Sequence, residues 1–329
     1  MSEVHKFIFE GLPVRGVLVR LTDAWSQILQ RRAANTTTGA YAQPVQNLLG
    51  EMVAAGVLMQ SNIKFDGALI LQIAGDGPVK LAVAEVQSDL SLRATVNLQT
   101  DVKDSATLSQ MVNVHNQGRC AITLDPNNKF PGQQPYQGVV PLFDDSGQPL
   151  QQLSAVLEHY MLQSEQLDTT LVLAADGAVA AGLLIQRLPV MGEKNLAGSM
   201  VSQDNEDQIG LNEHYNRISI LAKSLKREEL LTLDVETILR RLFWEETITR
   251  FEPLLGDAAP RFACNCSRER VARMIVGLGQ EEANSIVAER GDIEVGCEFC
   301  GAQYRFDAVD AAQLFVAPES TVMSSHNPH

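Results

Sequence analysis

Four of the five cysteines in this chain form two closely spaced pairs in its C-terminal part. Cys264 and Cys266 enclose one residue, Cys297 and Cys300 enclose two, and the 30 residues 267–296 separate the pairs. A segment of this length can fold back and bring all four sulfurs together. Four thiolates are the ligands of closed structural zinc sites, where zinc lies about 2.3 Å from each sulfur. The spacing therefore predicts a zinc site formed by Cys264, Cys266, Cys297 and Cys300.

The residues around both pairs favour ionised thiols. Gly301 follows Cys300, as in a zinc knuckle, where glycine lets backbone amides approach the sulfurs. We expect a helix to open at Ser267, directly after the first pair, and a helix N-terminus favours negative charge. Three arginines of this helix add positive charge: Arg268, Arg270 and Arg273. Thiolates bind zinc and are also the form that reacts with oxidants, so the site is expected to be sensitive to oxidation.

The zinc site can be a permanent structural clip or a redox switch. A disulfide closed within Cys264-Asn265-Cys266 would be a tight, strained ring, and strained disulfides are the reducible, regulatory kind. Structural zinc contributes on the order of 10 to 16 kcal/mol to folding, whereas a whole domain is stable by only about 5 to 15 kcal/mol. Loss of zinc should therefore unfold the small module at residues 261–315. We expect the site to act as a switch.

The sequence before the cysteines predicts an α+β domain, because residues 7–188 alternate strand-like runs with a few helical ones. A helix is expected around residues 45–57, with one apolar face against the sheets, and another over 150–163. Cys120 lies in an apolar strand-like run and is expected in the core. Gly75-Asp76-Gly77-Pro78 lacks the lysine of a Walker motif and is expected to be a β-turn. The strand-like runs are residues 17–19, 68–73, 81–83, 93–98 and 171–173.

A polar, Gly/Ser/Asp-rich stretch after Pro189 predicts a connector between domains. Two helices are expected after it, at residues 214–231 and 235–246, the second capped by Asp234. The second helix carries an apolar stripe at helical spacing: Val235, Ile238, Leu239, Leu242 and Phe243. Either the stripe is permanently docked, or it is a surface uncovered on activation. The expected parts are an N-terminal domain (1–190), a connector and helical linker (191–255), a C-terminal zinc-binding α+β module (256–316) and a polar tail (317–329).

Composition and missing motifs narrow the classes of function. A net charge of -14 disfavours nucleic acid as a partner, because such binding depends on Lys and Arg displacing phosphate counterions. No run approaches the roughly 18 apolar residues of a membrane span, and the first residues lack a secretory pattern. We therefore expect a cytoplasmic protein without membrane contact. No Walker motif, histidine metal spacing or catalytic triad is recognisable, so neither ATP use nor enzymatic activity is expected.

The cysteine segments resemble those of the redox-regulated holdase chaperones of the heat-shock protein 33 family, in Cys264-Asn265-Cys266-Ser267-Arg268-Glu269-Arg270 and Cys297-Glu298-Phe299-Cys300-Gly301. The resemblance covers about residues 4–316, but residues 31–41 look like a longer loop and 318–329 have no counterpart. Further segments resemble the family in the same order along the chain: Arg15-Gly16-Val17-Leu18-Val19, Phe65-Asp66-Gly67, Gly75-Asp76-Gly77-Pro78, Tyr136-Gln137-Gly138-Val139-Val140, Ser164-Glu165-Gln166-Leu167 and Glu228-Glu229-Leu230-Leu231.

The resemblance implies a chaperone that holds unfolding client proteins without ATP. In that family the reduced, zinc-bound form is inactive. Oxidation pairs neighbouring cysteines, releases zinc, unfolds the zinc module and the linker, and exposes a client-binding surface. Carried over residue by residue, the implied disulfides join Cys264 to Cys266 and Cys297 to Cys300. A homodimer of the oxidised form is also implied.

Two other classes of function compete with this interpretation. A zinc-ribbon regulator with a purely structural site would bind nucleic acid, which the acidic charge and the lack of interleaved basic and aromatic residues disfavour. A thiol oxidoreductase using Cys297 and Cys300 would need a thioredoxin-like βαβ context, which the surrounding sequence does not suggest.

Overall fold

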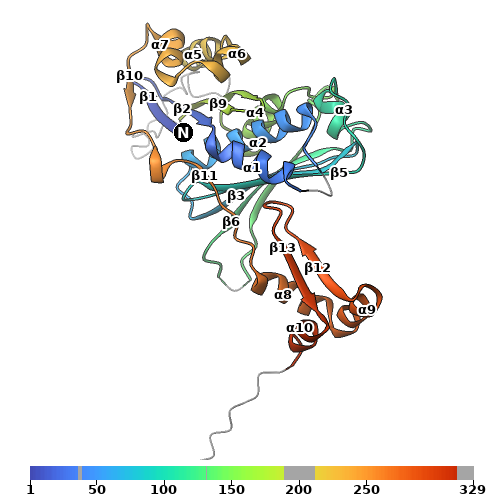
Figure 1. Ribbon diagram of the computed structural model, residues 1–329. Coiled ribbons are helices and arrows are strands. Elements are labelled where there is room, and N and C mark those ends of the chain that lie inside the picture. Colours follow the sequence, from blue (N-terminus) through green and yellow to red (C-terminus); the bar gives the residue numbers. More distant parts are fainter. Residues whose placement is uncertain (36–38, 131, 189–211, 317–329) are drawn as a thin grey trace, which may run out of the picture. The chain divides into compact units, whose positions relative to one another are not determined.

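The computed structural model describes residues 1–35, 39–130, 132–188 and 212–316 (Figure 1). Contacts group the chain into two units, Met1–Ala263 and Cys264–His329. Both units mix helices and strands, so the α+β prediction is confirmed. The predicted domain borders at residues 190, 255 and 316 stay predictions, because they state which parts of the chain fold independently. Residues 191–211 of the predicted connector and linker (191–255) and the predicted tail (317–329) lie outside the described residues.

The first of two large sheets, sheet A, has the strand order β10-β1-β2-β9-β8 and is antiparallel. Side chains alternate between its faces. In β2, Val17 and Val19 belong to one apolar cluster and Leu18 to another, so both faces of the sheet are covered. The strands are β1 (Glu3–Phe9), β2 (Val14–Leu21), β8 (Thr169–Ala175), β9 (Ala180–Arg187) and β10 (Ile248–Arg250).

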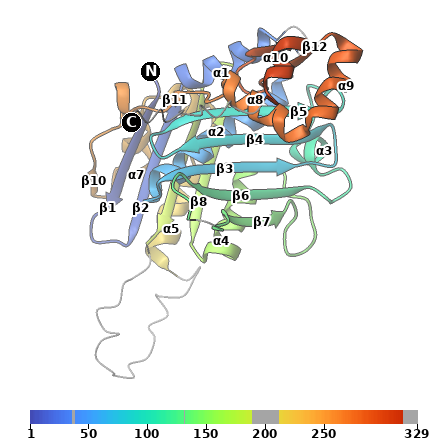
Figure 2. The same ribbon diagram turned by 90° about the horizontal axis from the view of Figure 1, so that it is seen from below.

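Sheet B has the strand order β11-β5-β4-β3-β6-β7, with β7 at its edge (Figure 2). Its pairs are antiparallel except that the short β11 pairs with β5 in parallel. Gly75-Asp76-Gly77-Pro78 joins β3 to β4, as the β-turn prediction requires. The strands are β3 (Gly67–Ala74), β4 (Val79–Gln87), β5 (Ser91–Leu98), β6 (Arg119–Pro126), β7 (Tyr136–Pro141) and β11 (Arg261–Phe262).

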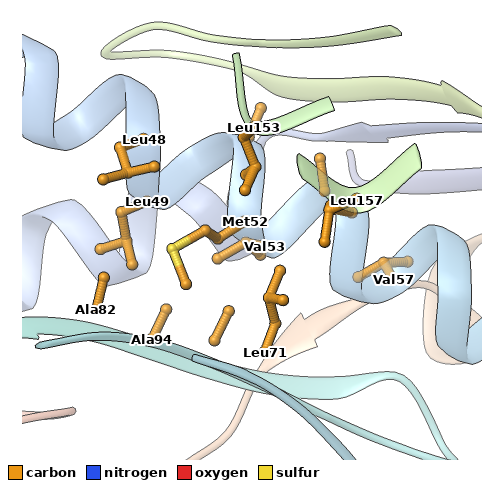
Figure 3. Close-up of a cluster of buried hydrophobic side chains, with 14 of the residues drawn as sticks. Leu48, Leu49, Met52, Val53, Val57, Leu71, Ala82, Ala94, Leu153 and Leu157 are labelled. Carbon is orange, nitrogen blue, oxygen red and sulfur yellow. The ribbon is translucent and has the colours of Figure 1, made fainter. Parts of the chain in front are cut away.

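Helix α2 (Gln43–Asn62) lies between the two sheets and forms the centre of the first unit (Figure 3). Sequence predicted one apolar face, but nearly the whole circumference is buried, including Ala54 and Ala55. The helix is buried on nearly all sides because sheets A and B cover its opposite sides. Gly50 allows the close approach, since a Cβ there would lie 2.4 Å from the Cβ of Ala175.

Three further helices surround this core: α1 (Asp23–Ala33), α3 (Leu108–Val112) and α4 (Leu153–Glu165). The predicted helix at 150–163 corresponds to α4, which begins three residues later because the Leu150 amide still donates to the Leu142 carbonyl, at 3.0 Å. The predicted loop at 31–41 is partly wrong, since α1 continues to Ala33. Buried Trp25 and Ile28 hold α1 in the core, and the guanidinium of Arg31 lies 4.6 Å from the ring centre of Phe262.

A layer of three helices covers the other face of sheet A: α5 (Glu213–Lys223), α6 (Arg227–Thr232) and α7 (Val235–Phe243). The prediction of one helix over 214–231 is wrong. The chain breaks after α5 because Leu225 turns into the core, and the Glu229 carboxylate accepts the Lys226 amide to begin α6. The Asp234 cap is confirmed, since its Oδ1 accepts the Thr237 amide at 2.9 Å. Helix α7 ends at Phe243, earlier than the predicted residue 246, before the chain enters β10.

The second unit contains the hairpin of β12 (Asp292–Gly296) and β13 (Gln303–Asp307) with three helices, α8 (Arg268–Leu278), α9 (Gln280–Arg290) and α10 (Ala308–Gln313). Its core is a small cluster around Ile275, Ile293 and Phe306. The predicted helix start is confirmed, because the Ser267 hydroxyl accepts the Arg270 amide.

Candidate metal centre

The fold brings the four clustered cysteines together. All four sulfurs lie within 4.8 Å of one another, and none forms a disulfide. Cys264 Sγ is 3.7 Å from Cys297 Sγ, and Cys266 Sγ is 3.3 Å from Cys300 Sγ. A tetrahedron with arms of about 2.3 Å has edges of about 3.8 Å, so sulfurs at these separations could hold one zinc-sized ion.

Two local structures position the sulfurs. Cys264 and Cys266 lie between β11 and the N-terminus of α8. Cys297 and Cys300 lie in the turn that joins β12 to β13, where the Cys297 amide donates to the Ala302 carbonyl at 2.9 Å. Gly301 has a φ of +75°, which a residue with a side chain rarely adopts, so the turn needs glycine here. This pair lies inside an antiparallel hairpin, whereas thioredoxin-like chemistry uses a βαβ unit.

Tyr304 is a part of the site that sequence reasoning missed. Its hydroxyl donates to Cys266 Sγ at 3.1 Å. The hydrogen bond raises the pKa of the Tyr304 phenol to about 12. In sequence Tyr304 is one of the alternating residues of β13, and its distance from Cys266 along the chain gives no sign of their contact. Only the folding back of the hairpin brings them together.

Burial and hydrogen bonds change the acidity of the clustered thiols. Burial raises the pKa of the Cys297 and Cys300 thiols. Burial acts in the same direction at Cys266, but hydrogen bonds from Tyr304 and from the neighbouring sulfurs outweigh it and lower the pKa to about 7. Four thiolates this close repel one another, and a divalent cation between them would remove that penalty. The donor set therefore fits a thiophilic metal ion.

Arg268 stabilises the module beside the cysteines. Its guanidinium lies 4.1 Å from the ring centre of Phe306, and it donates to the Asp310 carboxylate and the Arg305 carbonyl, both at 2.7 Å. The sequence interpretation assigned its charge to the thiols. The structure gives it a second role, because it ties the start of α8 to β13 and α10.

The predicted apolar stripe on α7 is buried against sheet A. Phe243 packs edge-on against Phe9, with ring centres 5.0 Å apart. All five predicted residues are buried in the same cluster: Val235, Ile238, Leu239, Leu242 and Phe243. Whether they become exposed on activation stays a prediction.

Polar contacts at the rim of the helical layer hold α6 in place. Arg20 of β2 donates to three carbonyls at the end of α6, those of Leu230, Leu231 and Leu233. Arg227 of α6 lies 3.9 Å from the carboxylate of Glu51 on α2. Burial raises the pKa of the Glu51 carboxyl to about 7, although Arg227 acts against this. These contacts escaped sequence analysis because the partners are far apart in the chain.

Two sequence expectations concern single features outside the cysteine cluster. Cys120 is fully buried in the core as predicted, and burial raises the pKa of its thiol to about 12. Among the residues that the structure describes, no helix is long and apolar enough to cross a membrane.

Comparison with known proteins identifies the family. Residues 2–307 match the family model described as Hsp33 protein. The 33 kDa chaperonin of Chromobacterium violaceum is 43% identical, over 95% of this chain and 94% of its own length. That of Methylobacillus flagellatus is 40% identical over the same shares. The crystal structure of the 33 kDa chaperonin of Thermotoga maritima has the same fold, with a TM-score of 0.68, 19% identity, and coverage of 95% of this chain and 98% of that one. The chain therefore belongs to the Hsp33 family.

Proposed function

We propose that this Hsp33-family chaperone is an oxidation-activated holdase, which binds unfolding proteins and prevents their aggregation without ATP. The observation that carries the proposal is the cluster of four reduced cysteines in a module whose own apolar core is small. A site of this composition links the redox state of its sulfurs to the folding of the residues around it.

The proposed metal ligands are Cys264, Cys266, Cys297 and Cys300. Zinc bound there would join the start of α8 to the β12–β13 hairpin and supply folding free energy of about 10 to 16 kcal/mol. Tyr304 would keep its hydrogen bond to Cys266 and so orient that sulfur.

Oxidation by a peroxide would remove this ligand set. Each disulfide forms from two thiols, which lose two electrons and two protons; the O–O bond of hydrogen peroxide breaks and two waters form. We propose the pairs Cys264 with Cys266 and Cys297 with Cys300. In the folded module the sulfurs also approach across the pairs, at 3.7 and 3.3 Å. Once the module loosens, partners two or three positions apart stay close, whereas residues separated by a long segment drift apart.

The second step is release of α5, α6 and α7 from sheet A. The chain runs from α7 through β10 and the two-residue strand β11 directly into Cys264. The connection pairs with β1 through β10 and with β5 through β11, so unfolding of the module would leave these short pairings to hold it. The uncovered surface would include the α7 stripe and apolar side chains of sheet A such as Phe7 and Phe9. Apolar surface of this kind is what unfolding client proteins bind.

The remaining parts of the proposal concern partners and location. We propose that the clients are unfolded or partly folded proteins, that the oxidised form is able to dimerise, and that the protein works in the cytoplasm. ATP, nucleic acid and membranes have no role in the proposed cycle, and no catalytic turnover is involved.

Light scattering from a thermally unfolding client tests this function. We expect suppression by protein pretreated with peroxide, none by the reduced zinc-loaded protein, and loss of suppression after reductant is added. Cys120→Ala is the matched control, because it removes the cysteine outside the cluster and should switch normally. Equal behaviour of both redox forms would instead support a purely structural zinc site.

A further inference from the structure

A small cavity opens between sheets A and B, where α2 and α4 end. Its volume is about 110 Å³. An engineered apolar cavity of about 150 Å³ holds benzene, so this one suits an aliphatic side chain. Its lining contains no residue of α5, α6 or α7, so release of these helices is not needed to open it. The floor is apolar: Met59, Leu69, Ile122, Leu124, Met161 and Leu184.

One side of the rim offers hydrogen-bond donors. Arg15 donates to Gln186 Oε1 through two nitrogens and to the Asn62 carbonyl, so its guanidinium is fixed beside the cavity. A guanidinium has five N–H donors, so Arg15 can donate a further hydrogen bond at the rim.

Another part of the rim offers an acceptor. The hydroxyls of Tyr136 and Tyr160 both donate to Glu165 Oε1, at 3.0 Å. The hydrogen bond to Glu165 raises the pKa of the Tyr136 phenol, and burial together with Glu165 raises that of the Tyr160 phenol, so the tyrosines remain neutral donors. A carboxylate has about four lone-pair sites, so Glu165 can accept a further hydrogen bond. Together the rim groups match a peptide unit, which has one acceptor and one donor.

The cavity adjoins the edge strand β7. Tyr136 of β7 lines the cavity, and Tyr136 and Val139 are each 52% exposed. Gly138 lets Tyr160 lie directly against this strand, since a Cβ there would be 2.5 Å from the Tyr160 oxygen. An edge strand leaves alternate backbone groups free to pair with an added strand.

We infer that this cavity and the β7 edge form a docking site for an extended segment of unfolded polypeptide, which inserts one aliphatic side chain between the sheets. This inference rests on the proposed holdase function and specifies part of its client surface. Because α5, α6 and α7 do not line the cavity, the reduced protein should already bind such a segment weakly.

The test is fluorescence anisotropy with the reduced, full-length protein and a labelled, capped heptapeptide of Ser and Thr around a central Leu. A matching peptide with a central Asp is the negative control. Met161→Trp, which fills the cavity, should weaken binding at least about tenfold. Leu162→Trp adds the same bulk to the next position of α4, a residue 40% exposed that does not line the cavity, and should bind normally.

The inference is overturned by equal binding of the Leu and Asp peptides, or by unchanged binding in Met161→Trp. A shift from dimer to monomer in Met161→Trp, seen by sedimentation, would assign the cavity to a second copy of this chain and also overturn it.

The two proposals fail separately. Loss of redox control in the light-scattering assay with peptide binding intact would contradict the switch alone. The docking site alone would be contradicted by two results together. The oxidised Met161→Trp variant would suppress client aggregation like the unchanged protein, and no peptide binding would be detected.

Discussion

The two units of this chain differ most in how they bury apolar surface. In the first unit, α2 is enclosed by two sheets and contributes Leu49, Met52 and Val53 to a continuous core. In the second, the cluster around Ile275 and Phe306 is small, and its helices leave large apolar side chains exposed. Small domains bury a smaller fraction of their surface and commonly gain stability from a metal or a disulfide. The first unit is thus stable through packing, whereas we propose that the second depends on its cysteines.

A similar contrast exists within the first unit. Helix α2 is covered on almost all sides, whereas α5, α6 and α7 pack through one face and meet solvent with the other. Helices docked through one face are the elements that detach at the lowest free-energy cost. The predictions below test these two contrasts.

The largest effect should come from Cys297→Ser, which leaves three thiolates at the site. We expect the module to lose its metal and unfold even in reductant, because its core cannot replace a contribution of about 10 kcal/mol. The first unit should keep its fold. Zinc titration with a chelating dye and hydrogen exchange over residues 264–316 measure both effects, with Cys120→Ala as the cysteine control. Full zinc affinity with native circular dichroism would overturn the four-ligand assignment.

The next effect concerns docking of α7. Phe243→Ala removes a buried ring that contacts Phe7 and Phe9 and should weaken docking by about 3 to 5 kcal/mol. The variant should suppress client aggregation without oxidant and bind a dye that reports apolar surface. Trp244→Ala changes the next aromatic residue, which is 73% exposed, and should behave like the unchanged protein. If the reduced Phe243→Ala protein exposes apolar surface but stays inactive, release of α7 is not sufficient for client binding.

The pH dependence of stability should report on Glu51. Its pKa of about 7 lies above the ordinary value of 4.5, so the folded protein binds an additional proton between these pH values. The contribution of Glu51 to the free energy of unfolding should therefore fall as pH rises from about 4.5 to 7, by at most about 3 kcal/mol. Glu51→Gln should flatten this part of the profile and be more stable than the parent above pH 7. Denaturant titrations at several pH values measure this, and the exposed Glu228→Gln is the control. A Glu51→Gln profile parallel to that of the parent would contradict the assignment.

The smallest effect should come from the cap of α8. Ser267→Ala removes the hydroxyl that accepts the Arg270 amide and should destabilise the module by about 1 kcal/mol. Ser267→Asp keeps a capping oxygen and should restore stability. Thermal unfolding of the zinc-loaded protein compares the two variants. Equal melting of all three proteins would show that the Ser267 cap does not contribute to the stability of the module.

Local patterns predicted those features that depend on neighbouring residues. The α7 stripe, the Asp234 cap and the Ser267 cap were all recognisable, because their partners lie within one helical turn. The spacing of the cysteines likewise anticipated a cluster that the fold assembles. What binds there, and the disulfide pairing, stay predictions.

Features that depend on distant parts of the chain could not be predicted in this way. Nothing near Arg20 indicates that it holds the end of α6, since its partners begin more than two hundred residues later. The full burial of α2 follows from two sheets built from separated segments. The break after α5 was missed because Leu225 fits a continuous helix in sequence, whereas the core requires it to turn inward.

Hydrogen exchange before and after peroxide treatment tests the central claim most directly, because it follows the module, α7 and α2 in one experiment. The account predicts that oxidation removes protection from residues 264–316 and from α7 (Val235–Phe243), while α2 (Gln43–Asn62) stays protected. Loss of protection in the module with α7 still fully protected would contradict it, because the cysteines would then control only their own module.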